Sequence, residues 1–282
     1  MKKIILLTMA IAASIASVFA SGSSEAQSKP LIAVSILPEQ TFVEKVVGDK
    51  MDIITLVGKG ASPENYELTP KERAQFESSK LYFTIGVPTE DLTILPYVNK
   101  DTQIISLQDR VDEVYAPIMM GPTRNPHIWL SPKRAILMVT EIADEVSKLD
   151  EKNKDYYMAN AKSYIKELEQ LDEYLASYFS DLDRREFIVY HPAFDYFAED
   201  YNLKVDIIEI EGKETTAKEL AALIENAKKV GIKNVFYQAE IADSQSATIA
   251  KELGGRAIQL DPLSPDYIEN LKETAKLIKE NI

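Results

Sequence analysis

The feature that most constrains the fold of this chain is an alternation of short β-branched runs with stretches of helical composition. Four runs precede Pro132 and four follow Arg185. They cover residues 31–36, 52–57, 81–86 and 102–107, and then 187–190, 204–210, 234–238 and 257–260. Apolar runs separated by helices are typical of buried parallel strands with helical crossovers. The sequence therefore predicts an α/β protein with two (β/α)4 lobes, each built on a parallel sheet.

A segment without glycine or proline, from Lys133 to Tyr190, connects the two sets of runs. Within it, apolar residues recur in alternating steps of four and three. They are Tyr157, Ala161, Tyr164, Leu168, Leu171, Leu175, Tyr178 and Leu182. This period predicts one long helix of about 30 residues and about 45 Å, able to join two lobes. An antiparallel helical hairpin or a coiled-coil seam is the alternative.

The predicted organisation has five parts. Residues 1–20 form a signal peptide, with a basic start, an apolar stretch and a small-residue end that predicts cleavage near Ala20. Residues 21–30 are small and polar and form a flexible tether. Residues 31–150 form an N-terminal lobe, 151–184 the long helix and 185–282 a C-terminal lobe. We therefore expect the mature protein to be exported.

The absence of cysteine excludes disulfides, thiolate metal sites and a cysteine nucleophile. It also excludes a lipid anchor on this chain, although Ser21 stands where an anchoring cysteine would be. The net charge of −13 opposes binding to nucleic acid and attracts cations. Solubility alone is the simpler interpretation of that charge.

Four side chains able to bind a metal follow predicted strands, where the ligands of parallel α/β sheets gather. Glu64 lies after the second strand and His127 beyond the fourth. His191 and Asp261 follow the first and last strands of the second set. We expect these two imidazoles and two carboxylates to meet in the cleft between the lobes. The plainer alternatives are ordinary loop histidines and, for Asp261 before Pro262, a turn or helix-capping residue.

Imidazole and carboxylate donors together suit zinc, manganese or iron(II) better than calcium or magnesium. Each donor must lose its proton to bind, so binding is expected to weaken as the pH falls through about 6 to 7. No G-x-S-x-G, phosphate-loop or H-E-x-x-H motif is present, and an enzyme is not indicated. The enzymatic alternative is a secreted metal-dependent hydrolase with Glu240 or Asp195 as its base.

Five motifs together resemble the metal-binding solute-binding proteins of zinc and manganese ABC transporters. They are LPEQTFVEKVVGD, GASPENYELTP, PHIWLSP, YHPAFDYFA and LDPL, and the likeness runs from about residue 31 to the C-terminus. The resemblance implies two lobes joined by a long backbone helix, with the metal held between them. It implies His127, His191 and Asp261 as ligands. Glu64 stands where the family usually has its first histidine, and Gln238 where manganese-type members often have a glutamate.

The function implied by this resemblance is capture of a divalent metal outside the cytoplasm, in the periplasm or its equivalent, for uptake. Zinc is the first candidate, manganese the second, and iron(II) fits the same donors. The implied partner is the membrane permease of an ABC transporter. The resemblance implies no enzymatic activity for this protein, and we expect it to be a monomer. A surface adhesin or a binder of an organic ligand is the third class of function considered.

Overall fold

The structure, a computed structural model, describes residues 29–210, 213–214, 216–240 and 244–282. The predicted signal peptide and most of the predicted tether lie outside the described residues. Within the described ranges, none of the helices is long and apolar enough to cross a membrane.

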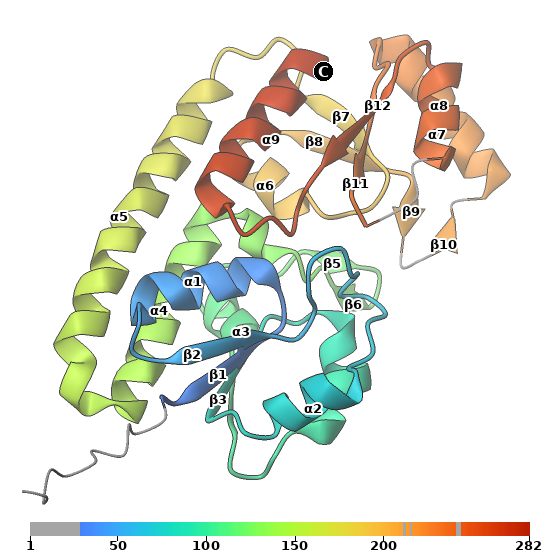
Figure 1. The fold of residues 1–282 in the computed structure, drawn as a ribbon. Coiled ribbons are helices and arrows are strands. Elements are labelled where there is room, and N and C mark those ends of the chain that lie inside the picture. Colours follow the sequence, from blue (N-terminus) through green and yellow to red (C-terminus); the bar gives the residue numbers. More distant parts are fainter. Residues whose placement is uncertain (1–28, 211–212, 215, 241–243) are drawn as a thin grey trace, which may run out of the picture.

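Two four-stranded parallel sheets form the frame of the molecule (Figure 1), which confirms the predicted fold class. The first sheet has the order β2-β1-β3-β4 and the second the order β12-β11-β7-β8. Their strands are β1 (Leu31–Val34), β2 (Asp52–Thr55), β3 (Leu81–Thr84), β4 (Gln103–Ser106), β7 (Glu186–Val189), β8 (Lys204–Ile207), β11 (Val235–Gln238) and β12 (Ala257–Leu260). In each sheet the strand order reverses beside the first strand of the set, and ligands of such sheets bind outside the carboxyl ends at that point.

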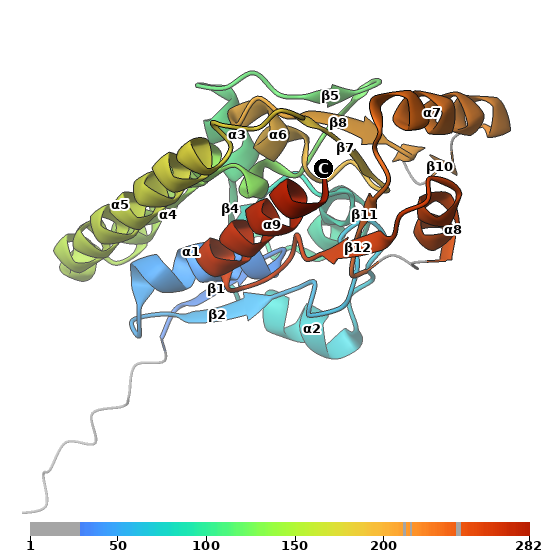
Figure 2. The same cartoon turned by 90° about the horizontal axis from the view of Figure 1, so that it is seen from above.

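Helices flank both sheets (Figures 1 and 2). They are α1 (Leu37–Val47), α2 (Pro70–Phe76), α3 (Leu107–Asp112), α4 (Pro132–Leu149), α5 (Lys154–Tyr178), α6 (Asp195–Asp200), α7 (Ala217–Val230), α8 (Ser244–Glu252) and α9 (Tyr267–Asn281). The predicted signals for α7 are confirmed, because Thr216 and Glu219 form a capping box and Gly231 ends the helix with a φ of 78°.

Two short antiparallel pairs were not predicted from the sequence. One pairs β5 (Met119–Met120) with β6 (Thr123–Arg124), and the other pairs β9 (Glu209–Ile210) with β10 (Lys213–Glu214). The predicted strand over 204–210 is therefore two strands, β8 and β9, on different sheets.

The long helix α5 runs alongside helices from both halves of the chain (Figure 1). It packs against α1 and α4 from the first half and against α9 from the second. Its predicted apolar stripe is buried from Tyr157 to Leu175. A short turn over Glu151–Asn153 joins α4 to α5, so the helix also forms the hairpin considered as the alternative. The 25 residues of α5 span about 37 Å.

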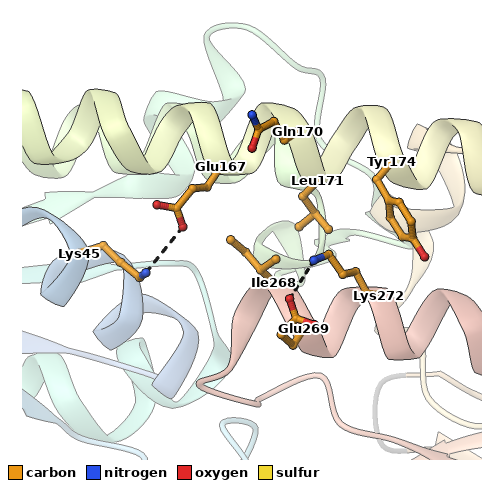
Figure 3. A pocket seen from close by; sticks show the side chains of 8 residues that line it. All are labelled: Lys45, Glu167, Gln170, Leu171, Tyr174, Ile268, Glu269 and Lys272. Carbon is orange, nitrogen blue, oxygen red and sulfur yellow. Dashed lines mark hydrogen bonds and ion pairs between the residues drawn. The ribbon is translucent and has the colours of Figure 1, made fainter.

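A groove of about 600 Å³ marks the junction of α1, α5 and α9 (Figure 3). Lys45 on α1 pairs with Glu167 on α5 at 3.7 Å across this groove. Lys272 and Glu269, one turn apart on α9, pair at 2.8 Å. Beneath the surface, one hydrophobic core includes residues of both sheets, such as Phe83 on β3 and Phe236 on β11. The lobe boundaries proposed above stay a prediction, since this shared core does not mark them.

Candidate metal centre

His127 is held as a neutral imidazole by Asn125. The Asn125 side-chain amide donates to the Pro192 carbonyl and to Asp195, each at 2.9 Å, which fixes its orientation. Its oxygen accepts the His127 backbone N–H at 3.0 Å and lies 2.8 Å from Nδ1. Since that oxygen can only accept, Nδ1 carries the proton and Nε2 keeps its lone pair for a metal. Burial, and next the neighbouring His191, lowers the pKa of His127 well below its usual range.

His191 follows β7 directly and lies between two carboxylates. Its Nδ1 is 3.0 Å from Glu209 at the start of β9, and its Nε2 is 2.8 Å from Glu64. Burial lowers the pKa of His191, but Glu209 and Glu64 outweigh burial and raise the pKa to about 9. The expected titration near pH 6 to 7 therefore describes neither histidine, because burial lowers the pKa of His127 whereas two carboxylates raise the pKa of His191.

The two imidazoles and Glu64 border one small cavity. The histidine rings meet edge to face with centroids 5.1 Å apart. The cavity also contacts Gln238 and Glu240 and has about 10 Å³ of room for a water-sized guest. That is close to the minimum needed to hold one water molecule. Its size therefore suits a single ion.

Glu240 also lines this cavity, although the sequence did not predict it as a metal ligand. Its Oε2 is buried and has no hydrogen-bond partner in the described part of the chain. Burial, and next the repulsion of Asp261, raises the pKa of Glu240. A buried carboxylate oxygen without a donor is an available ligand for a cation.

Asp261 lies at the neighbouring surface rather than at the small cavity. Its side chain is exposed, and its Oδ1 accepts the backbone N–H of Leu263 at 3.1 Å. It lines a separate cavity of about 210 Å³ together with Glu240. The structure thus brings together Glu64, His127 and His191 and leaves Asp261 outside.

The donors contact one another more closely than they would around a metal. Two ligands of a tetrahedral zinc lie about 3.3 Å apart, since each bond is about 2.0 to 2.1 Å. The contact of 2.8 Å between Glu64 and His191 is shorter. Accordingly, no three His, Asp or Glu side chains of the described residues stand at ligating distance from one point. Zinc must part this pair to enter.

Hydrogen bonds tie the two halves of the chain together beside His127. The Trp129 indole donates to the Pro262 carbonyl at 2.7 Å, and the Tyr267 hydroxyl donates to the Trp129 carbonyl at 2.7 Å. Trp129 is fully buried, and its ring centroid is 4.9 Å from that of His127. The His127 side of the cavity is therefore part of a closed seam.

Sequence reasoning missed Asn125 and Glu209, the two residues that orient the histidines. Asn125 has a detectable signal, since it lies two residues before His127. Glu209 has none, because it is 18 positions from His191 and only the parallel pairing of β7 with β8, extended by the hydrogen bond from the Glu209 N–H to the Tyr190 carbonyl, brings it there.

Two parallel sheets that hold paired imidazoles over an ion-sized cavity are the features of a binding protein for one small cation. Comparison with known proteins agrees. The family model described as zinc-uptake complex component A, periplasmic, matches residues 32–281. The chain belongs to this family, whose members are binding components of transport systems and not enzymes.

Individual relatives are similar over nearly the whole chain. The high-affinity zinc uptake system protein ZnuA of Bacillus subtilis is 28% identical, over 93% of this chain and 90% of that protein. The zinc-binding lipoprotein AdcA of Streptococcus pneumoniae is 27% identical over 99% of this chain, which spans only 61% of AdcA. The crystal structure of a zinc-bound ZnuA deletion mutant is 36% identical, with a TM-score of 0.84, over 90% of this chain and 98% of that one.

Proposed function

We propose that this protein captures zinc between its two sheets and delivers it to the membrane permease of an ABC transporter. One observation carries the proposal: the only two histidines of the chain converge, with Glu64, on a cavity of single-ion size. The names of the relatives in Bacillus and Streptococcus support zinc as the first candidate. The affinity order at nitrogen and oxygen donors favours zinc over manganese and iron(II). Manganese is the second candidate because the sequence resembles transporters of zinc and manganese, and iron(II) is the third.

In this proposal Glu64, His127 and His191 supply the first three donors. Asp261 is the proposed fourth donor, and it must release the Leu263 N–H and turn inward to bind. Glu240 is the competitor for that position, since it lines the cavity and its Oε2 has no partner among the residues that the structure describes. Two carboxylates with a dication make a nearly neutral centre, which lowers the free-energy cost of excluding water from it.

The deciding experiment is metal analysis of protein purified without added metal, followed by titration with zinc and with manganese against a chelating dye. We expect one equivalent of metal and a higher affinity for zinc. His127→Ala and His191→Ala should each lower the zinc affinity by roughly a hundredfold or more, since even loss of a group that orients a ligand costs about 10- to 100-fold.

The matched control is a pair of carboxylates in one loop. Glu64→Gln should weaken zinc binding, whereas Glu67→Gln, at an exposed position three residues later, should not. A protein with no bound transition metal and no measurable affinity for one would refute the proposal. The same titration separates it from a surface adhesin or an organic-ligand binder, for which the metal would be dispensable.

We further propose that the protein acts outside the cytoplasm as a monomer, after cleavage near Ala20. N-terminal sequencing of the exported protein tests the cleavage site. Light scattering of the zinc-loaded protein tests the monomer.

A further inference from the structure

Three of the hydrogen bonds that hold Asn125 come from one short segment in the second half of the chain. The Asn125 amide donates to the Pro192 carbonyl and to the Asp195 carboxylate, each at 2.9 Å. The Asn125 carbonyl accepts from the Tyr196 hydroxyl at 2.8 Å. This segment begins at His191, the other imidazole of the candidate metal centre. The segment that carries one proposed ligand therefore also contacts the residue that orients the other.

Asp195 bears on the protonation of His127 because it fixes which way the Asn125 amide lies. A carboxylate and a backbone carbonyl only accept hydrogen bonds, so both require the amide nitrogen on their side and leave the amide oxygen facing His127 Nδ1. Burial raises the pKa of Asp195 to about 6, so its carboxylate is ionised at pH 8. Without Asp195, the amide nitrogen would keep only the Pro192 carbonyl as an acceptor among the described residues.

Tyr196 fixes the backbone of Asn125. Its side chain is fully buried, and its hydroxyl also accepts the backbone N–H of Ile118 at 3.1 Å. Ile118 and Asn125 flank the β5–β6 hairpin, and the Asn125 N–H donates to the Ile118 carbonyl at 2.9 Å. The Arg134 guanidinium, on α4, lies 4.5 Å from the centroid of the Tyr196 ring and pairs with Asp200 of α6 at 3.2 Å. The base of the hairpin is therefore held from α6, which is itself fastened to α4.

We propose that Asp195 and Tyr196 are positioning residues for His127, which they place through Asn125. Asp195 sets the tautomer of the imidazole, and Tyr196 sets the position of the backbone that carries it. The two imidazoles then form one unit with a single segment, although they belong to different halves of the chain. Neither Asp195 nor Tyr196 is a proposed metal donor. The inference rests on the proposed zinc function and adds the residues that keep the site ready for zinc.

The test uses the fact that the chain has only two histidines. Labelling histidine with ¹⁵N gives two sets of imidazole signals, which a His191→Ala variant assigns. In the zinc-free wild type at pH 8, His127 should carry its proton on Nδ1. Asp195→Leu should convert part of His127 to the Nε2–H tautomer. It should also lower the zinc affinity, measured with a competing dye, by about tenfold or more, the usual effect of losing a group that orients a ligand.

Three further variants separate positioning from charge and from misfolding. Asp195→Asn removes the charge but keeps an acceptor oxygen, so it should retain the wild-type tautomer and most of the zinc affinity. Tyr196→Phe keeps the buried ring and should lower the zinc affinity by roughly two- to tenfold, the usual effect of losing one hydrogen bond. Glu199→Gln is the control, because Glu199 is exposed on the same helix and Arg134 keeps Asp200 without it. It should change neither measurement.

Several results would overturn this inference alone. One is His127 with its proton on Nε2 in the zinc-free wild type. Another is an unchanged zinc affinity in Asp195→Leu or in Tyr196→Phe. A third is an equal loss of affinity in Asp195→Asn and Asp195→Leu, which would assign the effect to charge. A wild type that binds no zinc would instead overturn the proposed function, and the tautomer of the zinc-free protein would still decide whether Asp195 orients His127.

Discussion

Replacing Glu39 by glutamine should stabilise the protein above neutral pH. Glu39 and Glu90 are buried at the carboxyl ends of β1 and β3, and neither pairs with a lysine or arginine among the described residues. Glu39 Oε2 accepts the backbone N–H groups of Ser35 and Ile36, whereas its Oε1 has no partner within the ranges that the structure describes. Glutamine has the same shape, keeps one acceptor oxygen and places a donor where Oε1 now lies.

The expected magnitude is taken from the pKa shift of Glu90, the partner of Glu39 in this buried pair. Burial, and next the repulsion of Glu90, raises the pKa of Glu39 well above its usual range. Burial also raises the pKa of Glu90 from 4.5 to about 7, despite hydrogen bonds from Ser35, Ile85 and Gly86. A shift of that size in Glu90 is worth about 3 kcal/mol, at 1.36 kcal/mol per pKa unit.

The sign follows from the raised pKa. The contribution of protonated Glu90 to the free energy of unfolding is fully present below pH 4.5, where this carboxyl holds its proton in both folded and unfolded protein. The contribution is lost as the pH rises through 7. Glu39→Gln replaces a carboxyl group whose ionisation is opposed by burial and by Glu90 in the folded protein. We therefore expect it to raise the free energy of unfolding by about 1 to 3 kcal/mol at pH 8 and by little at pH 5.

Urea unfolding at pH 5 and pH 8, with a chelator present to exclude metal effects, measures this difference. Glu44→Gln is the matched control, because Glu44 is exposed on the same helix α1. It should leave the free energy of unfolding unchanged within about 0.5 kcal/mol at both pH values. Destabilisation by Glu39→Gln at pH 8, or an equal gain at both pH values, would refute the reasoning.

Four further predictions concern the metal centre. The pKa of about 9 for His191 means that zinc must displace its proton, so the apparent zinc affinity should rise about tenfold per pH unit from pH 7 to 9 and level off above, as measured with a competing dye. Glu209→Gln should weaken zinc binding about 10- to 100-fold in the same assay, because Glu209 orients the His191 ring. If Glu240 rather than Asp261 completes the shell, Glu240→Gln should weaken zinc binding more than Asp261→Asn does, and the reverse order would assign Asp261. Because α5 and the Trp129 seam join the two halves, small-angle scattering should show no measurable change in the radius of gyration on zinc addition, and a large compaction would contradict this rigid frame.

The two sheets could be predicted because parallel strands buried on both faces appear as apolar runs between helices. Short elements could not. The pairs β5–β6 and β9–β10 have two residues per strand, too few for a period, and depend on the surrounding loops. The long helix predicted over 151–184 is shorter in the structure, because a turn over Glu151–Asn153 precedes α5 and the helix ends at Tyr178.

At the metal centre, the carboxyl ends of parallel strands indicate where a backbone position lies but not where its side chain turns. His127 and His191 meet because Asn125 and Glu209 hold their rings from opposite halves of the chain. Asp261 stands at an equally suitable strand end, but its carboxylate accepts a hydrogen bond from the Leu263 N–H. This agrees with the alternative interpretation of Asp261, before Pro262, as a turn residue. Asp261 binds metal only if coordination is worth more than the hydrogen bond that it gives up, typically about 1 kcal/mol. A strand-end pattern therefore predicts the members of a site, and the hydrogen bonds of each member decide which of them face the ligand.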